Sequence, residues 1–211
     1  MNRAGSLGCL VNAKSSSLLV ETAREVLLAA SAASRRSNLS AADWNIFASM
    51  SMKGIFLSLG SNLGERADNI ARAIAELSGH GVRVVQKSSL YETEPVGFVA
   101  QGWFLNCAVE VESDLTAPDL MQALLAIERS AGRERVTPKG PRIIDMDILL
   151  FGPLAVREAE LQIPHPRMTE RRFVLVPLAE IAAGVVHPVL QKTVAALLAE
   201  TRDRSEVRLF S

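Results

Sequence analysis

Hydrophobic positions after residue 53 follow strand-like and helix-like spacings in turn. Residues 54–60 form a short apolar run that ends in glycine, which is typical of a buried strand. Residues 68–77 repeat apolar side chains at the spacing of one helix face, and Gly79 and Gly81 are expected to end that helix. Residues 82–91 alternate imperfectly and predict a second strand.

The same alternation continues downstream of a loop that spans residues 95–102. Residues 104–111 predict a strand with one polar residue in its middle. Residues 118–131 predict a helix, because proline fits its first turn and Gly132 follows its last. Residues 143–151 are rich in branched apolar side chains, end before a glycine and predict a buried strand.

The predicted order is strand, helix, strand, strand, helix, strand. This βαββαβ order is that of an α+β ferredoxin-like sandwich, in which helices pack on an antiparallel sheet. A C-terminal extension with two short helices is expected after it. The compact domain is therefore predicted to span residues 53–211.

Residues 1–52 differ in composition from the rest. They are rich in Ser and Ala and poor in acidic residues, and no strand or turn pattern ties them to the following domain. We expect a weakly ordered leader. An organelle transit peptide and an over-extended start are both compatible with it, whereas a secretory signal does not fit.

Composition narrows the function classes. The chain has 211 residues, of which 48% are hydrophobic and 22% charged, and its formal net charge is zero. Zero net charge disfavours bulk binding to nucleic acid or to an anionic membrane, and no apolar run approaches the roughly 18 residues of a membrane span. The two distant cysteines, Cys9 and Cys107, suggest no disulfide framework. We expect a cytoplasmic monomer.

The strongest chemical signal lies in the last predicted strand. Asp145 and Asp147 stand at i and i+2, so both should project from one face. Paired carboxylates in an apolar strand need a cation, and Mg²⁺ suits hard oxygen ligands on a rigid element. Arg142 offers a bidentate fork for phosphate. The alternative interpretation is a strand with one solvated face.

Several motifs together resemble a known family. They are Gly60-Ser61-Asn62-Leu63-Gly64, Tyr91-Glu92-Thr93-Glu94-Pro95-Val96-Gly97, Phe104-Leu105-Asn106, Gly140-Pro141-Arg142 with the two aspartates, Pro164-His165-Pro166 and Arg171-Arg172-Phe173. This set resembles 6-hydroxymethyl-7,8-dihydropterin pyrophosphokinase over about residues 54–200. The resemblance implies transfer of diphosphate from ATP to a pterin alcohol in folate biosynthesis.

The resemblance also implies roles for individual residues. Asp145 and Asp147 would bind two Mg²⁺ ions, and Arg133 and Arg142 would stabilise charge during transfer. The implied ATP-binding residues are Glu128, Arg135, Arg142, Ile148, His165 and Arg171. The implied pterin-binding residues are Thr93, Val96, Phe104, Asn106 and Phe173. For Glu128 a solvated helix position, and for the two phenylalanines a place in the core, are the competing interpretations.

One segment departs from the family pattern. Pro138 and Lys139 stand where many members have a basic residue and an aromatic one, so an aromatic contact over the pterin is in doubt. Three rival hypotheses follow: an RNA-binding ferredoxin-like module, another nucleotide enzyme that uses Asp-x-Asp, and a catalytically impaired paralogue. The first lacks the aromatic signature of RNA-binding modules, and the second needs a larger nucleotide domain.

Overall fold

The computed structural model describes residues 52–95, 101–132 and 141–211, all within a compact unit that spans Ala48–Ser211. Its elements are β1 (Met52–Ser61), α3 (Arg66–Leu77), the 3-10 helix η1 (Ser78–His80), β2 (Val82–Lys87), β3 (Tyr91–Thr93), β4 (Phe104–Ser113), α4 (Ala117–Ser130), β5 (Asp145–Phe151), β6 (Val156–Arg157), β7 (Gln162–Ile163), the 3-10 helix η2 (Met168–Glu170), α5 (Arg172–Ala182), α6 (Val194–Glu200) and β8 (Val207–Leu209).

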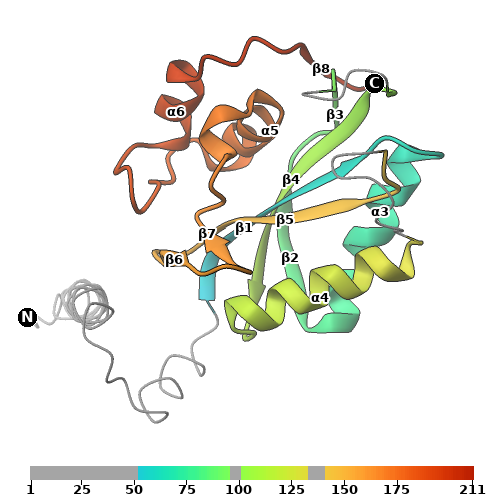
Figure 1. Ribbon diagram of the computed structural model, residues 1–211, viewed down its shortest axis with the longest axis horizontal. Helices are drawn as coiled ribbons and strands as arrows, with labels where there is room; N and C mark the ends of the chain where they lie inside the picture. Colours follow the sequence, from blue (N-terminus) through green and yellow to red (C-terminus); the bar gives the residue numbers. More distant parts are fainter. Residues whose placement is uncertain (1–51, 96–100, 133–140) are drawn as a thin grey trace, which may run out of the picture. The chain divides into compact units, whose positions relative to one another are not determined.

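The main sheet has the strand order β5-β1-β4-β3-β8, and β2 also pairs with β4 (Figure 1). Its pairings are antiparallel. Strand β4 thus lies between β1 and β2, which α3 connects, so the predicted split βαββαβ arrangement is confirmed. Among the described residues, no helix is long and apolar enough to cross a membrane.

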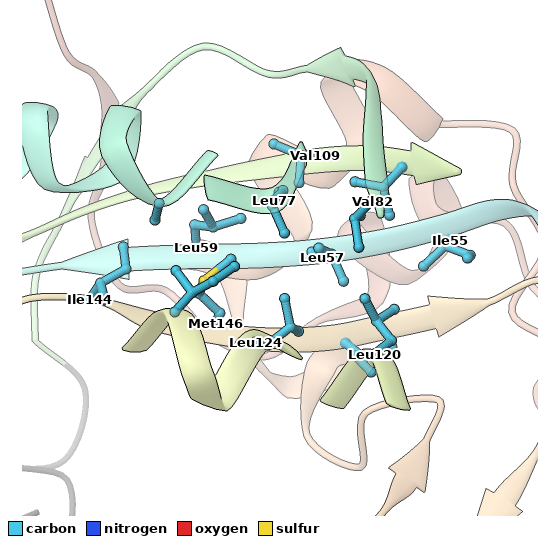
Figure 2. Packing of buried hydrophobic residues seen from close by; sticks show 14 of the residues in the cluster. Ile55, Leu57, Leu59, Leu77, Val82, Val109, Leu120, Leu124, Ile144 and Met146 are labelled. Carbon is cyan, nitrogen blue, oxygen red and sulfur yellow. The ribbon is translucent and has the colours of Figure 1, made fainter. Parts of the chain in front are cut away.

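Helices α3 and α4 cover one face of the sheet (Figure 2). Alternate residues of β1, namely Ile55, Leu57 and Leu59, point into this layer and are fully buried. Met146 of β5 and Leu124 of α4 belong to the same cluster. Burial of each such side chain contributes about 1.5–3 kcal/mol, so this layer is the main source of stability.

Helices α5 and α6 cover only part of the opposite face. Their apolar side chains pack against Phe56, Ala108, Leu149 and Leu150 of the sheet. The register of β1 with β5 shifts between Phe56 and Leu57, which lets two consecutive leucines of β5 join this cluster. Further along the same strands, the positions on this face become polar, and the candidate site lies there.

The strand predicted over residues 82–91 is two strands. Lys87 pairs with Val109, and Tyr91 pairs with Asn106, so β2 and β3 fit one extra residue against β4. Buried Ser88 occupies the break, where its hydroxyl accepts a hydrogen bond from the Ala108 amide at 3.0 Å. A side-chain partner of this kind is not visible in an alternation pattern.

Candidate active site

Two carboxylates mark the polar end of the face that α5 and α6 leave open. Met146 and Ile148 of β5 are buried under α3 and α4, so Asp145 and Asp147 project from the opposite face. The register sets Asp145 opposite Gly60 and Asp147 opposite Ser58 of β1. The predicted pairing of the two carboxylates on one face is therefore confirmed.

The charge on this pair is incompletely balanced. Burial, followed by the neighbouring charges of Asp145 and Glu128, raises the pKa of Asp147 to about 7, while Arg171 and Arg142 act in the opposite direction. Near neutral pH the site therefore gains from a further cation. Among the described residues, no group of three or more His, Cys, Asp or Glu side chains could hold a metal ion. Two carboxylates nevertheless fit Mg²⁺, which completes its shell with water and phosphate.

Arg142 connects the carboxylate pair to the rest of the site. Its Nη1 lies 2.6 Å from Asp145 Oδ2, and its guanidinium carbon lies 5.9 Å from the centre of the Phe104 ring. Its Nε is buried and has no hydrogen-bond partner within the described part of the chain. A buried donor without a partner is costly, so this nitrogen is well suited to an anionic ligand.

Asn62 holds Arg142 in place. Its Oδ1 accepts a hydrogen bond from the Arg142 amide at 2.8 Å, and its Nδ2 donates to Gln101 Oε1 at 3.1 Å. The Asn62 amide also donates to the Arg142 carbonyl at 3.2 Å. Asn62 belongs to the Gly60–Gly64 motif, but its role could not be predicted from the sequence, because its partners lie about 40 and 80 positions away.

His165 and Arg171 approach the carboxylates from the segment after β7. Burial and the nearby Arg171 lower the pKa of His165 to about 4, and burial also lowers the pKa of Arg171. His165 Nδ1 accepts a hydrogen bond from the Arg167 amide at 3.2 Å. The neutral ring therefore carries its hydrogen on Nε2, which is a donor toward a ligand.

A second group of polar residues lies on the same face of the sheet as the carboxylates, two strands away. Asn106 is buried on β4, opposite Gly60 of β1 and Tyr91 of β3. Its Nδ2 donates a 2.7 Å hydrogen bond to Oγ1 of buried Thr93. The carboxamide is thereby fixed in orientation, and it can offer a donor and an acceptor to a flat polar ligand.

Two half-buried phenylalanines accompany these groups. Phe104 lies at the start of β4 beside Arg142, and Phe173 lies in the first turn of α5, where the Arg171 guanidinium carbon is 5.5 Å from its ring centre. Neither residue is fully buried. Both phenylalanines therefore contact arginines that also act on the carboxylate pair, and both remain available for stacking.

Gly60 makes this arrangement possible. A Cβ at position 60 would lie 2.6 Å from Asn106 Oδ1. We expect Gly60→Ala to displace the Asn106 carboxamide and to cost about 1–3 kcal/mol of unfolding free energy. Thermal unfolding and the side-chain amide signals of Asn106 in NMR spectra measure both effects. Gly79→Ala is the control, because its Cβ would meet nothing within 4 Å; equal behaviour of the two variants would contradict the prediction.

The side chains of Glu128 and Ile148 are not placed for direct contact with ATP. Glu128 is buried, and its Oε1 accepts a 2.7 Å hydrogen bond from the Met146 amide, between the two aspartates. Solvation of Glu128 on the helix surface, the competing interpretation, is therefore wrong. The Ile148 side chain is in the core under the helices, so a ligand on the carboxylate face could reach only its backbone.

Several predicted residues lie outside the described part of the chain. They are Val96, Arg133, Arg135, Pro138 and Lys139, together with residues 1–51 of the expected leader. The described residues still bring together nine predicted ones from five regions of the sequence: Thr93, Phe104, Asn106, Arg142, Asp145, Asp147, His165, Arg171 and Phe173.

The chain is similar in sequence to known proteins of one family. Residues 56–183 match the family model of 7,8-dihydro-6-hydroxymethylpterin-pyrophosphokinase. The chain is 46% identical over 131 residues to the 2-amino-4-hydroxy-6-hydroxymethyldihydropteridine pyrophosphokinase of Bacillus subtilis, covering 62% of this chain and 78% of that protein. It is 44% identical over 136 residues to the protein of the same name from Methylorubrum extorquens, covering 64% and 86%.

Longer relatives match as well. The folic acid synthesis protein fol1 of Pneumocystis carinii is 40% identical over 155 residues, which is 74% of this chain but only 21% of that protein. The chain thus spans about a fifth of that relative's length. The wild-type HPPK-DHPS structure of Plasmodium falciparum with pterin and p-hydroxybenzoate superposes with a TM-score of 0.55 at 18% identity, over 74% of this chain and 44% of that one.

The last comparison supports the fold alone, because its identity is low. The family match, by contrast, covers more than half of the chain and contains both aspartates, Asn106 and the residues from Arg142 to Phe173. The chain belongs to the 7,8-dihydro-6-hydroxymethylpterin pyrophosphokinase family.

Proposed function

We propose that this chain transfers diphosphate from ATP to the hydroxymethyl group of 6-hydroxymethyl-7,8-dihydropterin, giving AMP and the pterin diphosphate, as a step of folate biosynthesis. Family membership supports this reaction. The observation that carries it is the pair Asp145 and Asp147 flanked by Arg142, Arg171 and His165, on the same sheet face as Asn106.

Asp145 and Asp147 are the residues that would hold magnesium, and two ions are expected. When bound, Mg²⁺ would neutralise phosphate charge and polarise the phosphorus–oxygen bonds. The raised pKa of Asp147 supports this assignment, because a carboxylate that resists ionisation in the metal-free protein is stabilised by a cation.

The cationic residues are proposed to orient the phosphates of ATP. Arg142 would use its buried Nε and the side of its fork that does not meet Asp145. Arg171 adds a second positive charge, and neutral His165 would donate from Nε2 without adding charge. Phosphoryl-type transfer depends mainly on such positioning and charge stabilisation.

Four further residues complete the proposed ATP site. Arg133 and Arg135 are proposed to act on the phosphates, as in the family. Glu128 is proposed to act by holding the Met146 amide between the two metal-binding positions, and Ile148 by its backbone. In the proposed reaction the pterin hydroxyl releases its proton to solvent as its oxygen attacks the β-phosphorus. The bond between that phosphorus and the oxygen bridging to the α-phosphorus breaks, and AMP leaves with the bonding electron pair.

The pterin is proposed to lie against Asn106 and between the rings of Phe104 and Phe173. The Asn106 carboxamide, fixed by Thr93, would pair with the polar edge of the heterocycle. Backbone groups at Thr93 and Val96 are proposed as additional edge contacts. The half-buried state of both phenylalanines supports stacking, because part of each residue stays accessible, although Phe173 also packs against the apolar cluster of α5 and α6.

Phe173→Ala is expected to weaken binding of the pterin but not of ATP. Loss of one stacking face should raise the Kd for the pterin about tenfold, whereas the Kd for ATP should change less than twofold. Isothermal titration calorimetry with the pterin and with a non-hydrolysable ATP analogue measures both constants on one sample. Equal losses for both ligands would argue against a stacking role.

The reaction itself is tested by AMP release from ATP and Mg²⁺ with and without 6-hydroxymethyl-7,8-dihydropterin. We expect AMP only when the pterin is present; AMP that forms equally without it would contradict the proposal.

We also propose that residues 53–211 carry the activity, so a chain that begins at Met52 should match the full chain. A monomeric state and a cytoplasmic location belong to the same proposal.

A further inference from the structure

Strand β8 adds an edge to the sheet beside the proposed pterin site. It pairs with β3, with Tyr91 opposite Leu209 and Thr93 opposite Val207. Backbone bonds extend the pairing at both ends: the Glu94 amide donates to the Glu206 carbonyl at 3.3 Å, and the Phe210 amide donates to the Leu90 carbonyl at 2.9 Å. Strand β3 has only three residues. It pairs with β4 on its other side, and Glu180 of α5 accepts hydrogen bonds from Tyr91 and Ser89, so β8 provides one of its three attachments.

Arg208 anchors β8 to two other parts of the molecule. Its Nη2 and Nε lie 2.7 and 3.1 Å from Glu92 Oε2, and its guanidinium carbon lies 4.5 Å from the centre of the Trp103 ring. Glu92 also binds Arg66 at 2.8 Å, and Arg66 donates to the Trp103 carbonyl at 2.7 Å. Arg208, Glu92, Arg66 and Trp103 thus form a cluster, here named the Arg208 cluster.

The Arg208 cluster connects β3 and the start of β4, the two strands that carry the proposed pterin contacts. Glu92 immediately precedes Thr93, which holds the Asn106 carboxamide at 2.7 Å. Trp103 immediately precedes Phe104, the proposed stacking residue on β4. A change in the position of β3 relative to β4 would therefore displace the Thr93 hydroxyl from Asn106 and alter the orientation of the Asn106 carboxamide.

We propose that Arg208 and β8 are positioning elements for the pterin site, which support pterin binding by fixing β3 against β4. Arg208 acts through Glu92 and Trp103 rather than by touching the substrate. This inference rests on the function proposed above, in particular on Asn106 as the pterin contact. On the proposed ATP side, the two carboxylates lie on β5, Arg142 precedes β5 and Arg171 precedes α5. Loss of Arg208 or of β8 should therefore affect ATP binding little.

The test compares Arg208→Ala, Arg208→Lys and a chain that ends after Ser205 with Arg83→Ala as a control. Arg83 is matched to Arg208, because it is an exposed arginine that pairs with a glutamate, Glu112, on a neighbouring strand, but it lies on β2, away from the site. The shortened chain keeps Asp203, whose Oδ2 accepts a hydrogen bond from the Arg172 amide at 2.7 Å.

We expect Arg208→Ala and the shortened chain to raise the KM for the pterin about tenfold, with the KM for ATP changed less than twofold. Arg208→Lys should show a smaller rise, because an ammonium group keeps the charge opposite Glu92 but not the planar contact with Trp103. Arg83→Ala should leave both constants unchanged. Side-chain amide NMR signals of Asn106 should shift in both Arg208 variants and in the shortened chain, but not in Arg83→Ala.

Two results would overturn the inference while the wild-type chain is active. One is an equal rise in both KM values that tracks a fall in Tm, since this would mean that β8 only stabilises the fold. The other is a set of constants no different from those of Arg83→Ala. Failure of the proposed function is recognised separately: the wild-type chain would then release no pterin-dependent AMP.

Discussion

Asp147→Asn and Asp145→Asn are each expected to lower kcat at least about 10³-fold, because each removes a negative charge that would hold the cation at the phosphates. The asparagine keeps the size and polarity of the side chain, so the fold should be retained. Steady-state AMP release under saturating ATP and pterin measures the effect. Asp114→Asn is the control, because Asp114 is exposed in the turn between β4 and α4.

Asp147→Asn should also stabilise the metal-free protein at alkaline pH. The pKa of Asp147 is raised from 3.8 to about 7 by burial and by Asp145. Between these two pH values the folded state therefore binds more protons than the unfolded state. The contribution of protonated Asp147 to the free energy of unfolding is fully present below about pH 4 and is lost as the pH rises through 7.

Urea unfolding of the metal-free protein at pH 8 measures this difference. Asp147→Asn should be more stable than the wild type there by on the order of 2 kcal/mol, with little difference near pH 4. Mg²⁺ should stabilise the wild type and narrow the gap. Wild-type turnover in the variant would contradict the metal assignment. Lower stability than the metal-free wild type at pH 8 would contradict the raised pKa of Asp147.

Asn106→Ala is expected to weaken pterin binding about 10²-fold, because a site built to pair with a polar edge loses both its donor and its acceptor. Calorimetric titration with the pterin, in the presence of a non-hydrolysable ATP analogue, measures the loss. ATP binding by the same variant is the internal control and should be unchanged.

Thr93→Val tests whether the orientation of Asn106 matters. Valine has nearly the same shape as threonine but cannot accept the 2.7 Å hydrogen bond from Asn106 Nδ2. Pterin affinity should fall about tenfold, less than in Asn106→Ala, because the carboxamide remains but is free to rotate. Pterin affinity that is unchanged in both variants would remove Asn106 from the site.

Local patterns in the sequence were enough to predict the central fold. The alternation in β5 placed Asp145 and Asp147 on one face, and burial of Met146 and Ile148 on the other confirms it. The helix over residues 118–131 was found to within one residue at each end, since Pro118 and Gly132 bound it. Both signals are short-range, so the sequence displays them directly.

Features that depend on distant partners were not predictable in this way. Strand β8 is recognisable only through its pairing with β3, which lies more than 100 positions earlier. Asn62 and Glu128 owe their roles to the backbone amides of Arg142 and Met146, which no pattern within their own segments indicates. Hydrogen bonds between side chains and distant backbone groups are set by tertiary structure rather than by propensity.

The most direct test of the central claim is a ³¹P NMR spectrum of the products that the full chain forms from ATP, Mg²⁺ and 6-hydroxymethyl-7,8-dihydropterin. We expect equal amounts of AMP and a pterin diphosphate ester, and neither product with Asp147→Asn. ADP with a pterin monophosphate, or ATP left intact while the pterin is bound, would contradict it.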